Sequence, residues 1–149
     1  QMKKHAIRDH ETNLFNKKYF LAELKTSTAR AMRNNTPLSI LTMRIDDFEE
    51  EGKHYDEKTK EEIFRILGGL ITSLTRISDV ACRYEENHFS ILLYDTKEEN
   101  AVILEKRIRE ALDNHDFGVI PELNFTFSTA QFSAEETAES FVERTHRKK

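Results

Sequence analysis

The amino-acid sequence predicts an α/β fold, an α+β two-layer sandwich in which helices cover a sheet that contains a central β-hairpin. Three observations lead to this class. Helix-like and strand-like patterns alternate along the chain in the order α-β-α-β-β-α-β-α. Apolar residues recur at helical spacing between positions 63 and 74. The stretch RYEENHFSILLYD, residues 83–95, has the pattern of two strands joined by a short polar turn.

The first elements follow from local patterns. Residues 13–34 carry a rough apolar stripe and end at NNTP, which indicates a helix. Residues 37–48 are a short apolar run with β-branched residues, typical of a buried strand. Residues 56–78 show the clearest helical spacing of the chain. Residues 79–84 and 88–95 are the two strands of the hairpin.

The second half of the chain repeats the alternation. Residues 98–115 place apolar side chains on one face, so we expect a third helix. Residues 123–132 alternate apolar and polar side chains, as a half-buried strand does. A last helix is expected over 133–149, because Ser133 followed three residues later by Glu136 has the pattern of a capping box.

Composition limits the classes of function. The 149 residues suit one domain, residues 1–149, and the charged helix-like ends suggest a piece of a larger signalling protein. A net charge of −4 with both signs well mixed argues against binding a nucleic-acid polymer. The single cysteine, Cys82, fits a reducing compartment, and no apolar stretch suits a membrane span or signal peptide, so we expect a cytoplasmic location. The histidines show no metal-ligand spacing and are expected at the surface.

Three stretches follow, in order, the motifs of one known family. DHETNLFNKKYF, residues 9–20, resembles D-x-L-T-G-L-x-N-R-R-x-F. Residues 37–64, from PLSILTMRIDDF onward, resemble P-L-S-L-L-x-x-D-I-D-x-F-K-x-x-N-D-x-x-G-H-x-x-G-D-x-x-L. RISDVACRYEENHFSILLYDT, residues 76–96, resembles R-x-x-D-x-x-x-R-Y-G-G-[DE]-E-F-x-x-L-L-P-x-T. The chain thus resembles the bacterial GGDEF, or diguanylate cyclase, family. The resemblance implies a nucleotidyl-cyclase-like fold with a central mixed sheet and the hairpin inside it.

The resemblance fails at the positions that carry the family's chemistry. The two signature glycines, which let the backbone approach GTP, are Glu85 and Glu86 here. The two acidic residues that follow them in the family are Asn87 and His88, and the first of these positions is a magnesium ligand in the family. The other magnesium ligand, the first aspartate of D-I-D, is Arg44.

These replacements predict a chain that is not an enzyme, a degenerate GGDEF domain without metal or cofactor. Mg²⁺ prefers anionic oxygen ligands, and a guanidinium has no acceptor atom. The family's phosphate-binding lysine is Glu49, and its guanine-binding asparagine and aspartate fall on Gly52 and Glu61. Arg44 is expected to lie close to the acidic hairpin turn and to offset its charge partly.

One family site survives in the sequence. Arg76 and Asp79 match the R-x-x-D of the inhibitory site, five residues before the signature, where the resemblance implies binding of cyclic di-GMP. A guanidinium can pair with guanine or phosphate, and a carboxylate can accept from the guanine N1–H and N2–H. Arg76 should end the second helix and Asp79 should open the next strand, so both face one corner. Arg107 matches a family position that supplies a second arginine.

Three functions therefore stand beside one another. The first is a cyclic di-GMP receptor that uses Arg76, Asp79 and Arg107. The second is a dimerisation or partner-docking module, as a homodimer or with other domains of a longer chain, that binds no nucleotide. The third is a relic that binds GTP without turning it over. R-x-x-D is also a common pattern in helix ends and turns, where the helix dipole favours an arginine and aspartate favours a turn.

Overall fold

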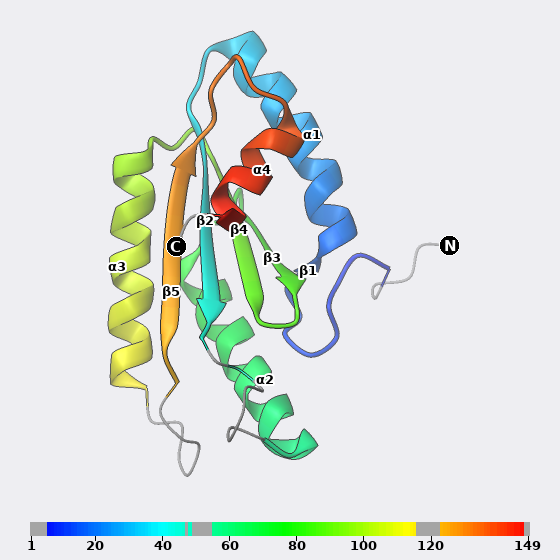
Figure 1. Cartoon of the computed structure of the whole chain (residues 1–149), viewed down its shortest axis with the longest axis vertical. Coiled ribbons are helices and arrows are strands. Elements are labelled where there is room, and N and C mark those ends of the chain that lie inside the picture. Colours follow the sequence, from blue (N-terminus) through cyan, green and yellow to red (C-terminus); the bar gives the residue numbers. More distant parts are fainter. Residues whose placement is uncertain (1–5, 47, 49–54, 116–122, 148–149) are drawn as a thin grey trace.

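The computed structural model of the protein describes residues 6–46, 48, 55–115 and 123–147. Helices and strands alternate along this part of the chain, as Figure 1 shows. In chain order the elements are β1 (Phe15–Asn16), α1 (Lys17–Asn34), β2 (Leu38–Ile45), α2 (Glu57–Leu74), β3 (Val80–Glu85), β4 (His88–Tyr94), α3 (Glu98–Asn114), β5 (Phe125–Gln131) and α4 (Ala138–Arg147).

The described strands form one mixed sheet in the order β1-β3-β4-β2-β5. β1 pairs with β3 in parallel, and the other pairings are antiparallel. The β3–β4 hairpin lies inside the sheet, with an irregularity in its register between Arg83 and Glu85. The predicted fold class, a mixed sheet with an internal hairpin and flanking helices, is confirmed.

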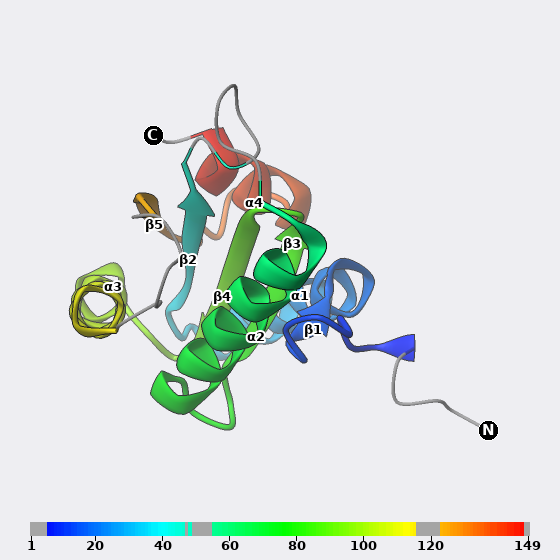
Figure 2. The same cartoon turned by 90° about the horizontal axis from the view of Figure 1, so that it is seen from below.

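The sheet buries both of its faces. Leu41 and Met43 of β2 belong to a core shared with α2 and α3, whereas Leu38 and Ile40 belong to a second core shared with α1 and α4. Because successive side chains of a strand point to opposite faces, the apolar strand β2 contributes side chains to both cores. Cys82 of β3 lies fully buried in the second core. Figure 2 shows helices on both sides of the sheet, so the two-layer arrangement is corrected to three layers.

The first helix begins later than its apolar stripe suggests. Phe15 and Asn16 form the short strand β1, and α1 starts at Lys17 rather than at position 13. The side chain of Asn16 accepts a hydrogen bond from the backbone N–H of Tyr19 at 2.9 Å, which caps the helix. The preceding apolar residues therefore pack as strand and loop.

The last helix also begins later than predicted. The expected capping-box bond is present, because the backbone N–H of Ser133 donates to Glu136 Oε1 at 2.9 Å. That bond closes a turn, and α4 starts only at Ala138. The hydroxyl of Thr137 takes the capping role and accepts from the N–H of Ser140 at 3.0 Å.

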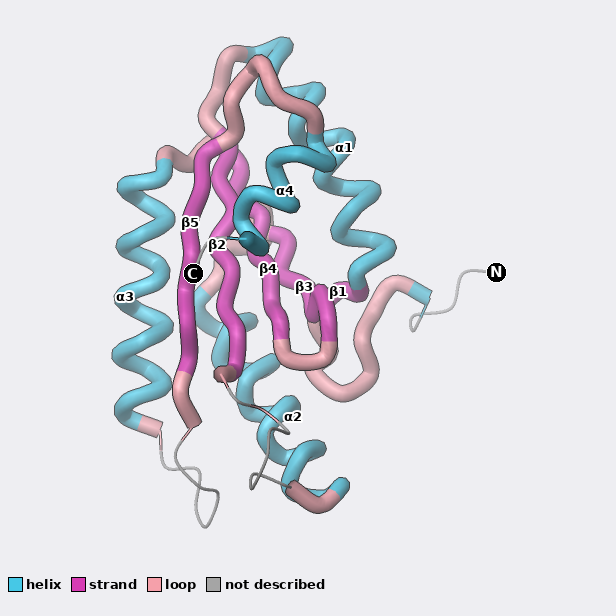
Figure 3. Tube along the Cα trace, viewed as in Figure 1, coloured by secondary structure: helices cyan, strands magenta, loops and turns pink. Residues whose placement is uncertain are grey.

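Residues 6–16, here called the N-terminal segment, pack beside β3 and α2, and Figure 3 shows this mainly irregular stretch next to the hairpin. Arg83 of β3 reaches into it and forms ion pairs with Asp9 and Glu11. The Arg83 guanidinium also lies 3.7 Å from the ring centroid of Phe64 on α2. Arg83 thus ties the segment, the hairpin and α2 together.

Gly68 of α2 sets the distance between α2 and the N-terminal segment. A Cβ atom at this position would lie 2.0 Å from the carbonyl oxygen of Thr12. Only a residue without a side chain leaves room for that backbone. The backbones of α2 and the N-terminal segment are therefore in direct contact at Gly68.

Candidate functional site

The hairpin turn holds the positions that replace the family signature. Glu85 ends β3 and is exposed, as is Glu86. His88, the first residue of β4, lies with its Nδ1 3.1 Å from Glu85 Oε1. Arg83 donates from Nε to the carbonyl oxygen of Glu86 at 3.0 Å. Contacts within the hairpin therefore hold Glu85 and the backbone of Glu86.

Arg44 lies opposite His88 of β4, next to the acidic turn, and its described ion pair is with Asp46. Its approach to Glu85 or Glu86 stays a prediction. Its Nε and Nη2 donate to Asp46 Oδ1 at 3.2 and 3.1 Å. The hydroxyl of Thr126 on β5 donates to the same carboxylate at 2.8 Å. The Asn87 amide donates from Nδ2 to the carbonyl oxygen of Ile45 at 3.0 Å. The described side-chain partners of Arg44 and Asn87 therefore lie at the end of β2.

These contacts do not fit a magnesium ion. Arg44 places a cation where the family has a metal ligand, and Asp46 already accepts from Arg44 and Thr126. Asn87 turns its donor, not its oxygen, toward the backbone. Within the described ranges no group of three or more His, Cys, Asp or Glu side chains could hold a metal ion. Glu49 and Gly52 lie outside the described residues, and Glu61 is exposed on α2.

The C-terminal helix covers the same end of the sheet. His146 of α4 lies with Nε2 3.2 Å from Ser90 Oγ, and its ring centroid lies 4.2 Å from that of Tyr84. Burial, and after it the neighbouring His88, lower the pKa of His146 to about 4. The sequence expectation of a surface histidine is wrong here, because a lone histidine near a chain end gives no signal of what packs on it. This end of the sheet is occupied by the protein's own side chains.

Arg76 and Asp79 meet as the sequence predicts, in the turn between α2 and β3. Asp79 Oδ2 accepts from the backbone N–H of Arg76 at 2.7 Å, and Oδ1 accepts from Arg76 Nη2 at 2.8 Å. Arg76 Nη2 also donates to Thr96 Oγ1 at 2.9 Å. The hydrogen bond that the Arg76 side chain donates to Asp79 is the main cause of a raised pKa of Arg76. The turn therefore holds a charged guanidinium in a fixed position.

The two members of this pair differ in exposure. The side chain of Asp79 is 2% exposed and that of Arg76 is 56% exposed. Asp79 therefore orients Arg76, and Arg76 presents the outer edge of its guanidinium to solvent. The hydrogen bonds described for Arg76 use its backbone N–H, Nε and Nη2. The pair borders a pocket of about 280 Å³, which Arg8, Leu14, Phe15, Thr72, Thr75, Ile77 and Ala81 also line.

Arg107, the third predicted residue of this site, lies on α3. It is exposed on α3, nine residues after the first residue of that helix, Glu98. At 1.5 Å per residue the offset along the helix is about 13 Å, whereas Arg76 contacts Thr96 just before α3 begins. Its part in ligand binding stays a prediction.

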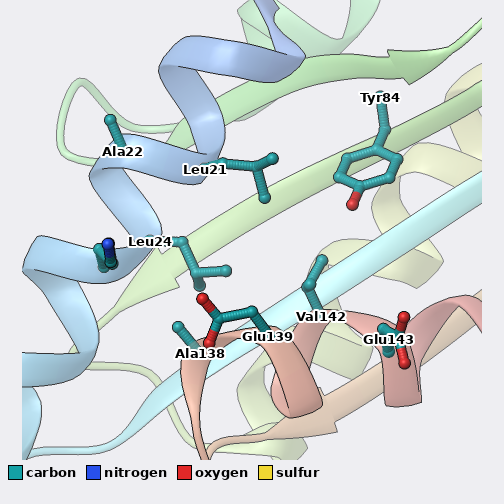
Figure 4. A pocket seen from close by; sticks show the side chains of 9 residues that line it. Leu21, Ala22, Leu24, Tyr84, Ala138, Glu139, Val142 and Glu143 are labelled. Carbon is teal, nitrogen blue, oxygen red and sulfur yellow. The ribbon is translucent and has the colours of Figure 1, made fainter.

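A larger groove of about 470 Å³ lies between α1 and α4, on the opposite face of the sheet from α2. Leu21, Leu24 and Val142 form its apolar floor in Figure 4, where the ring of Tyr84 closes one end. Glu139 and Glu143 also line the groove. None of the positions that the sequence singles out for chemistry lines this groove.

Comparison with known families assigns the chain to a class. The family model described as "Diguanylate cyclase, GGDEF domain" matches residues 6–143. The match covers most of the 149 residues. The chain therefore belongs to the GGDEF domain family.

Curated relatives carry the same domain within longer chains. The probable diguanylate cyclase DgcT of Escherichia coli is 32% identical over 108 residues, which are 72% of this chain and 24% of DgcT. The response regulator PleD of Caulobacter vibrioides is 28% identical over 145 residues, 93% of this chain and 32% of PleD. The chain spans about a quarter to a third of these relatives.

Solved structures share the fold. The GGDEF domain of FimX from Pseudomonas aeruginosa superposes with a TM-score of 0.87 at 17% identity, covering 95% of this chain and 90% of that one. The GGDEF domain of DgcB from Caulobacter crescentus, solved in complex with c-di-GMP, gives 0.85 at 21% identity, covering 98% and 86%. At these identities the likeness shows the fold. In the described part of the chain, no helix is both long and apolar enough to cross a membrane.

Proposed function

We propose that this chain is a catalytically inactive GGDEF domain that binds cyclic di-GMP through Arg76 and Asp79. One observation carries the proposal. Asp79 is buried and holds the Arg76 guanidinium, while the half-exposed Arg76 side chain lines a pocket of about 280 Å³. Membership of a family in which the GGDEF domain of DgcB was solved with c-di-GMP supports the choice of ligand.

The binding mode follows from the donors that Arg76 presents. The described hydrogen bonds of Arg76 leave its Nη1 group open, so Nη1 can donate to a phosphate oxygen or to an acceptor atom of guanine. The pocket is slightly smaller than the roughly 300–1,000 Å³ typical of small-molecule sites, so only part of the ligand enters it. Asp79 acts first through Arg76, because its own oxygens are already occupied.

The proposed lack of cyclase activity rests on the Arg44 contacts. Phosphoryl transfer needs cations that neutralise the triphosphate and activate the attacking hydroxyl. Arg44 forms an ion pair with Asp46, and Glu85 and Glu86 add negative charge at the turn. A carboxylate about 4 Å from a phosphate charge repels it by roughly 4 kcal/mol at an effective dielectric constant of 20.

Calorimetric titration with cyclic di-GMP tests the receptor proposal. We expect binding by the wild-type chain and a loss of about ten- to a hundredfold in affinity for Arg76→Ala, because a charge-assisted hydrogen bond contributes about 1.5–3 kcal/mol. Arg65→Ala is the matched control, since Arg65 is an exposed arginine on α2 that pairs with Glu62. Silent titration at about 100 μM ligand, together with an unchanged melting temperature, sinks the proposal; a hundredfold excess over the Kd stabilises by about 2.7 kcal/mol.

Incubation with GTP and Mg²⁺ tests the proposed inactivity separately. We expect no cyclic di-GMP above a control without protein. Product that scales with protein concentration overturns this half of the proposal and leaves the binding half standing. Titration with GTP in the same buffer distinguishes a receptor from a relic that retains only substrate binding.

A second candidate function is self-association without a nucleotide, and the apolar groove between α1 and α4 is the observation that favours it. A second copy of the chain could cover Leu21 and Val142, which line the groove. Sedimentation analysis of the wild-type chain and of Leu21→Glu decides this point. A dimer that Leu21→Glu dissociates supports the docking function, and a monomer at about 100 μM rejects it.

A further inference from the structure

A second arginine lines the pocket of Arg76. Arg8 belongs to the N-terminal segment and precedes the first family motif in the sequence. Both guanidiniums are charged at neutral pH. Asp79 is the one carboxylate among the described residues that line the pocket, and it is already hydrogen-bonded to Arg76. Two cations that share a small pocket with one buried anion leave an excess of positive charge there.

The Arg8 side chain is held in place without a carboxylate partner among its described contacts. Its Cζ lies 4.0 Å from the ring centroid of Phe15, and Phe15 in turn stacks on Tyr19 with centroids 4.3 Å apart. Arg8 Nη1 donates to the carbonyl oxygen of Asn13 at 3.1 Å. A backbone bridge between Arg8 and Phe15 fixes the chain beneath it. Stacking orients the guanidinium plane and spends none of its hydrogen-bond donors.

We propose that Arg8 is a second phosphate-binding residue of this pocket and that one ligand phosphodiester is shared by Arg8 and Arg76. This inference rests on the proposed binding of cyclic di-GMP. A phosphodiester has two terminal oxygens and one negative charge, so it can accept from both guanidiniums and reduce their repulsion. Ile77 lines the same pocket and is fully exposed, at 105%. Its side chain offers an apolar surface to a guanine ring.

The two arginines belong to separate parts of the chain. Arg76 lies in the turn after α2, and Arg8 lies in the segment before β1. A phosphate bound by both joins the N-terminal segment to that turn. Ligand binding should therefore protect the backbone of residues 8–16 as well as the turn itself.

Titration with cyclic di-GMP across matched variants of the whole chain tests this inference. We expect Arg8→Gln, which keeps the length of the stem, to weaken binding at least about tenfold, as loss of a charge-assisted bond implies. Arg65→Gln is the control, because Arg65 lies on α2 about 13 Å along the helix from its last residue, Leu74, and Arg76 follows that helix. Its affinity should stay within about twofold of wild type. Arg8→Lys keeps the positive charge but loses the planar guanidinium, so its affinity should lie between those of Arg8→Gln and Arg65→Gln.

Each outcome decides between the two proposals. If wild type binds, Arg76→Ala binds weakly and Arg8→Gln binds like wild type, this inference is overturned and the receptor function stands. If wild type gives no heat and no shift in melting temperature, both fall. Should Arg8→Gln melt early without ligand, Arg8→Lys decides, and wild-type affinity in a stably folded Arg8→Lys overturns the inference as well.

Discussion

Two places in the molecule bring an arginine and an aspartate together in different ways. One is the hairpin end of the sheet, with Arg44 and Asp46, and the other is the turn after α2, with Arg76 and Asp79, here called the Arg76 corner. At the hairpin, Arg44 and Asp46 are both partly exposed, at 32% and 25%, and Thr126 binds the same carboxylate. At the corner the aspartate is 2% exposed and the arginine 56%. The first arrangement satisfies both charges within the protein. The second buries the anion and directs the cation outward.

This difference teaches which ion pairs suit a binding site. A pair whose members share the same exposure gains little from a ligand, because each charge already has its partner. A pair with one buried member keeps its geometry while the exposed member stays open to an anion. The corner, not the hairpin, has the form of a site.

The corner depends on Gly68, and removing that glycine should break it with the largest effect. Gly68→Ala places a Cβ against the Thr12 carbonyl, a backbone group that cannot rotate away. We expect a loss of about 3 kcal/mol or more in the free energy of unfolding. Urea denaturation measures it.

Gly69→Ala is the matched control for Gly68→Ala. No atom lies within 4 Å of a Cβ at position 69, so alanine should raise stability by up to about 1 kcal/mol through helix propensity. Equal effects of the two substitutions would contradict the packing described for Gly68.

The next largest effect concerns Arg83, which links the hairpin to the segment that carries Arg8. Arg83→Met keeps the stem over Phe64 but leaves Asp9 and Glu11 without their cation. We expect a loss of about 2–3 kcal/mol, less than for a fully buried pair because both carboxylates are partly exposed. Urea denaturation of Arg83→Met and Arg65→Met compares a buried with an exposed arginine; equal losses count against the link.

The dependence of stability on pH tests whether α4 packs against the hairpin end of the sheet and buries His146 there. The pKa of His146 is lowered from 6.5 to about 4. The unfolded chain therefore binds a proton that the folded chain refuses, and stability falls as pH drops from about 6.5 to 4. Partial exposure limits the effect to on the order of 1–2 kcal/mol.

Melting curves between pH 4 and 7.5 follow this effect. His88 and Glu85 on the hairpin and Lys17 on α1 also act on the His146 charge. His146→Gln removes only the His146 proton, so its loss of stability over this range should be smaller than that of wild type. The same slope in both proteins contradicts a buried His146.

The smallest effect is expected at Arg44, and it contrasts the two ion pairs directly. Arg44→Ala should cost about 0.5–1 kcal/mol, as partly exposed pairs do. Under the proposed receptor function, affinity for cyclic di-GMP should stay within about twofold of wild type, whereas Arg76→Ala should weaken it strongly. A double-mutant cycle with Asp46→Ala isolates the pair. A coupling energy above about 2 kcal/mol means the pair is stronger than its exposure suggests.

Patterns that depend on neighbours in the chain were sufficient for much of the fold. Periodicity placed the helices and strands, and family motifs placed Arg76 and Asp79 in one turn, as the structure shows. Contacts between distant elements were not visible in the same way. The partner of Arg44 and the burial of His146 each depend on which side chains the sheet brings together.

The layer count and Arg8 illustrate the same limit. An apolar strand predicts burial but does not tell which of its faces a helix covers. Arg8 precedes the first motif, so neither spacing nor resemblance singled it out. It joins the Arg76 pocket only because the N-terminal segment packs on α2.

Cys82 gives the molecule an internal reporter of opening. The thiol is fully buried among α1 and α4 residues, and burial raises its pKa far above the ordinary value. Since the thiolate is the reactive form, a labelling reagent reacts only after the core beneath α1 has opened. The chain has no second cysteine to confuse the signal. The rate at which Cys82 is modified therefore measures how often the native state opens on the face of the sheet opposite the Arg76 corner.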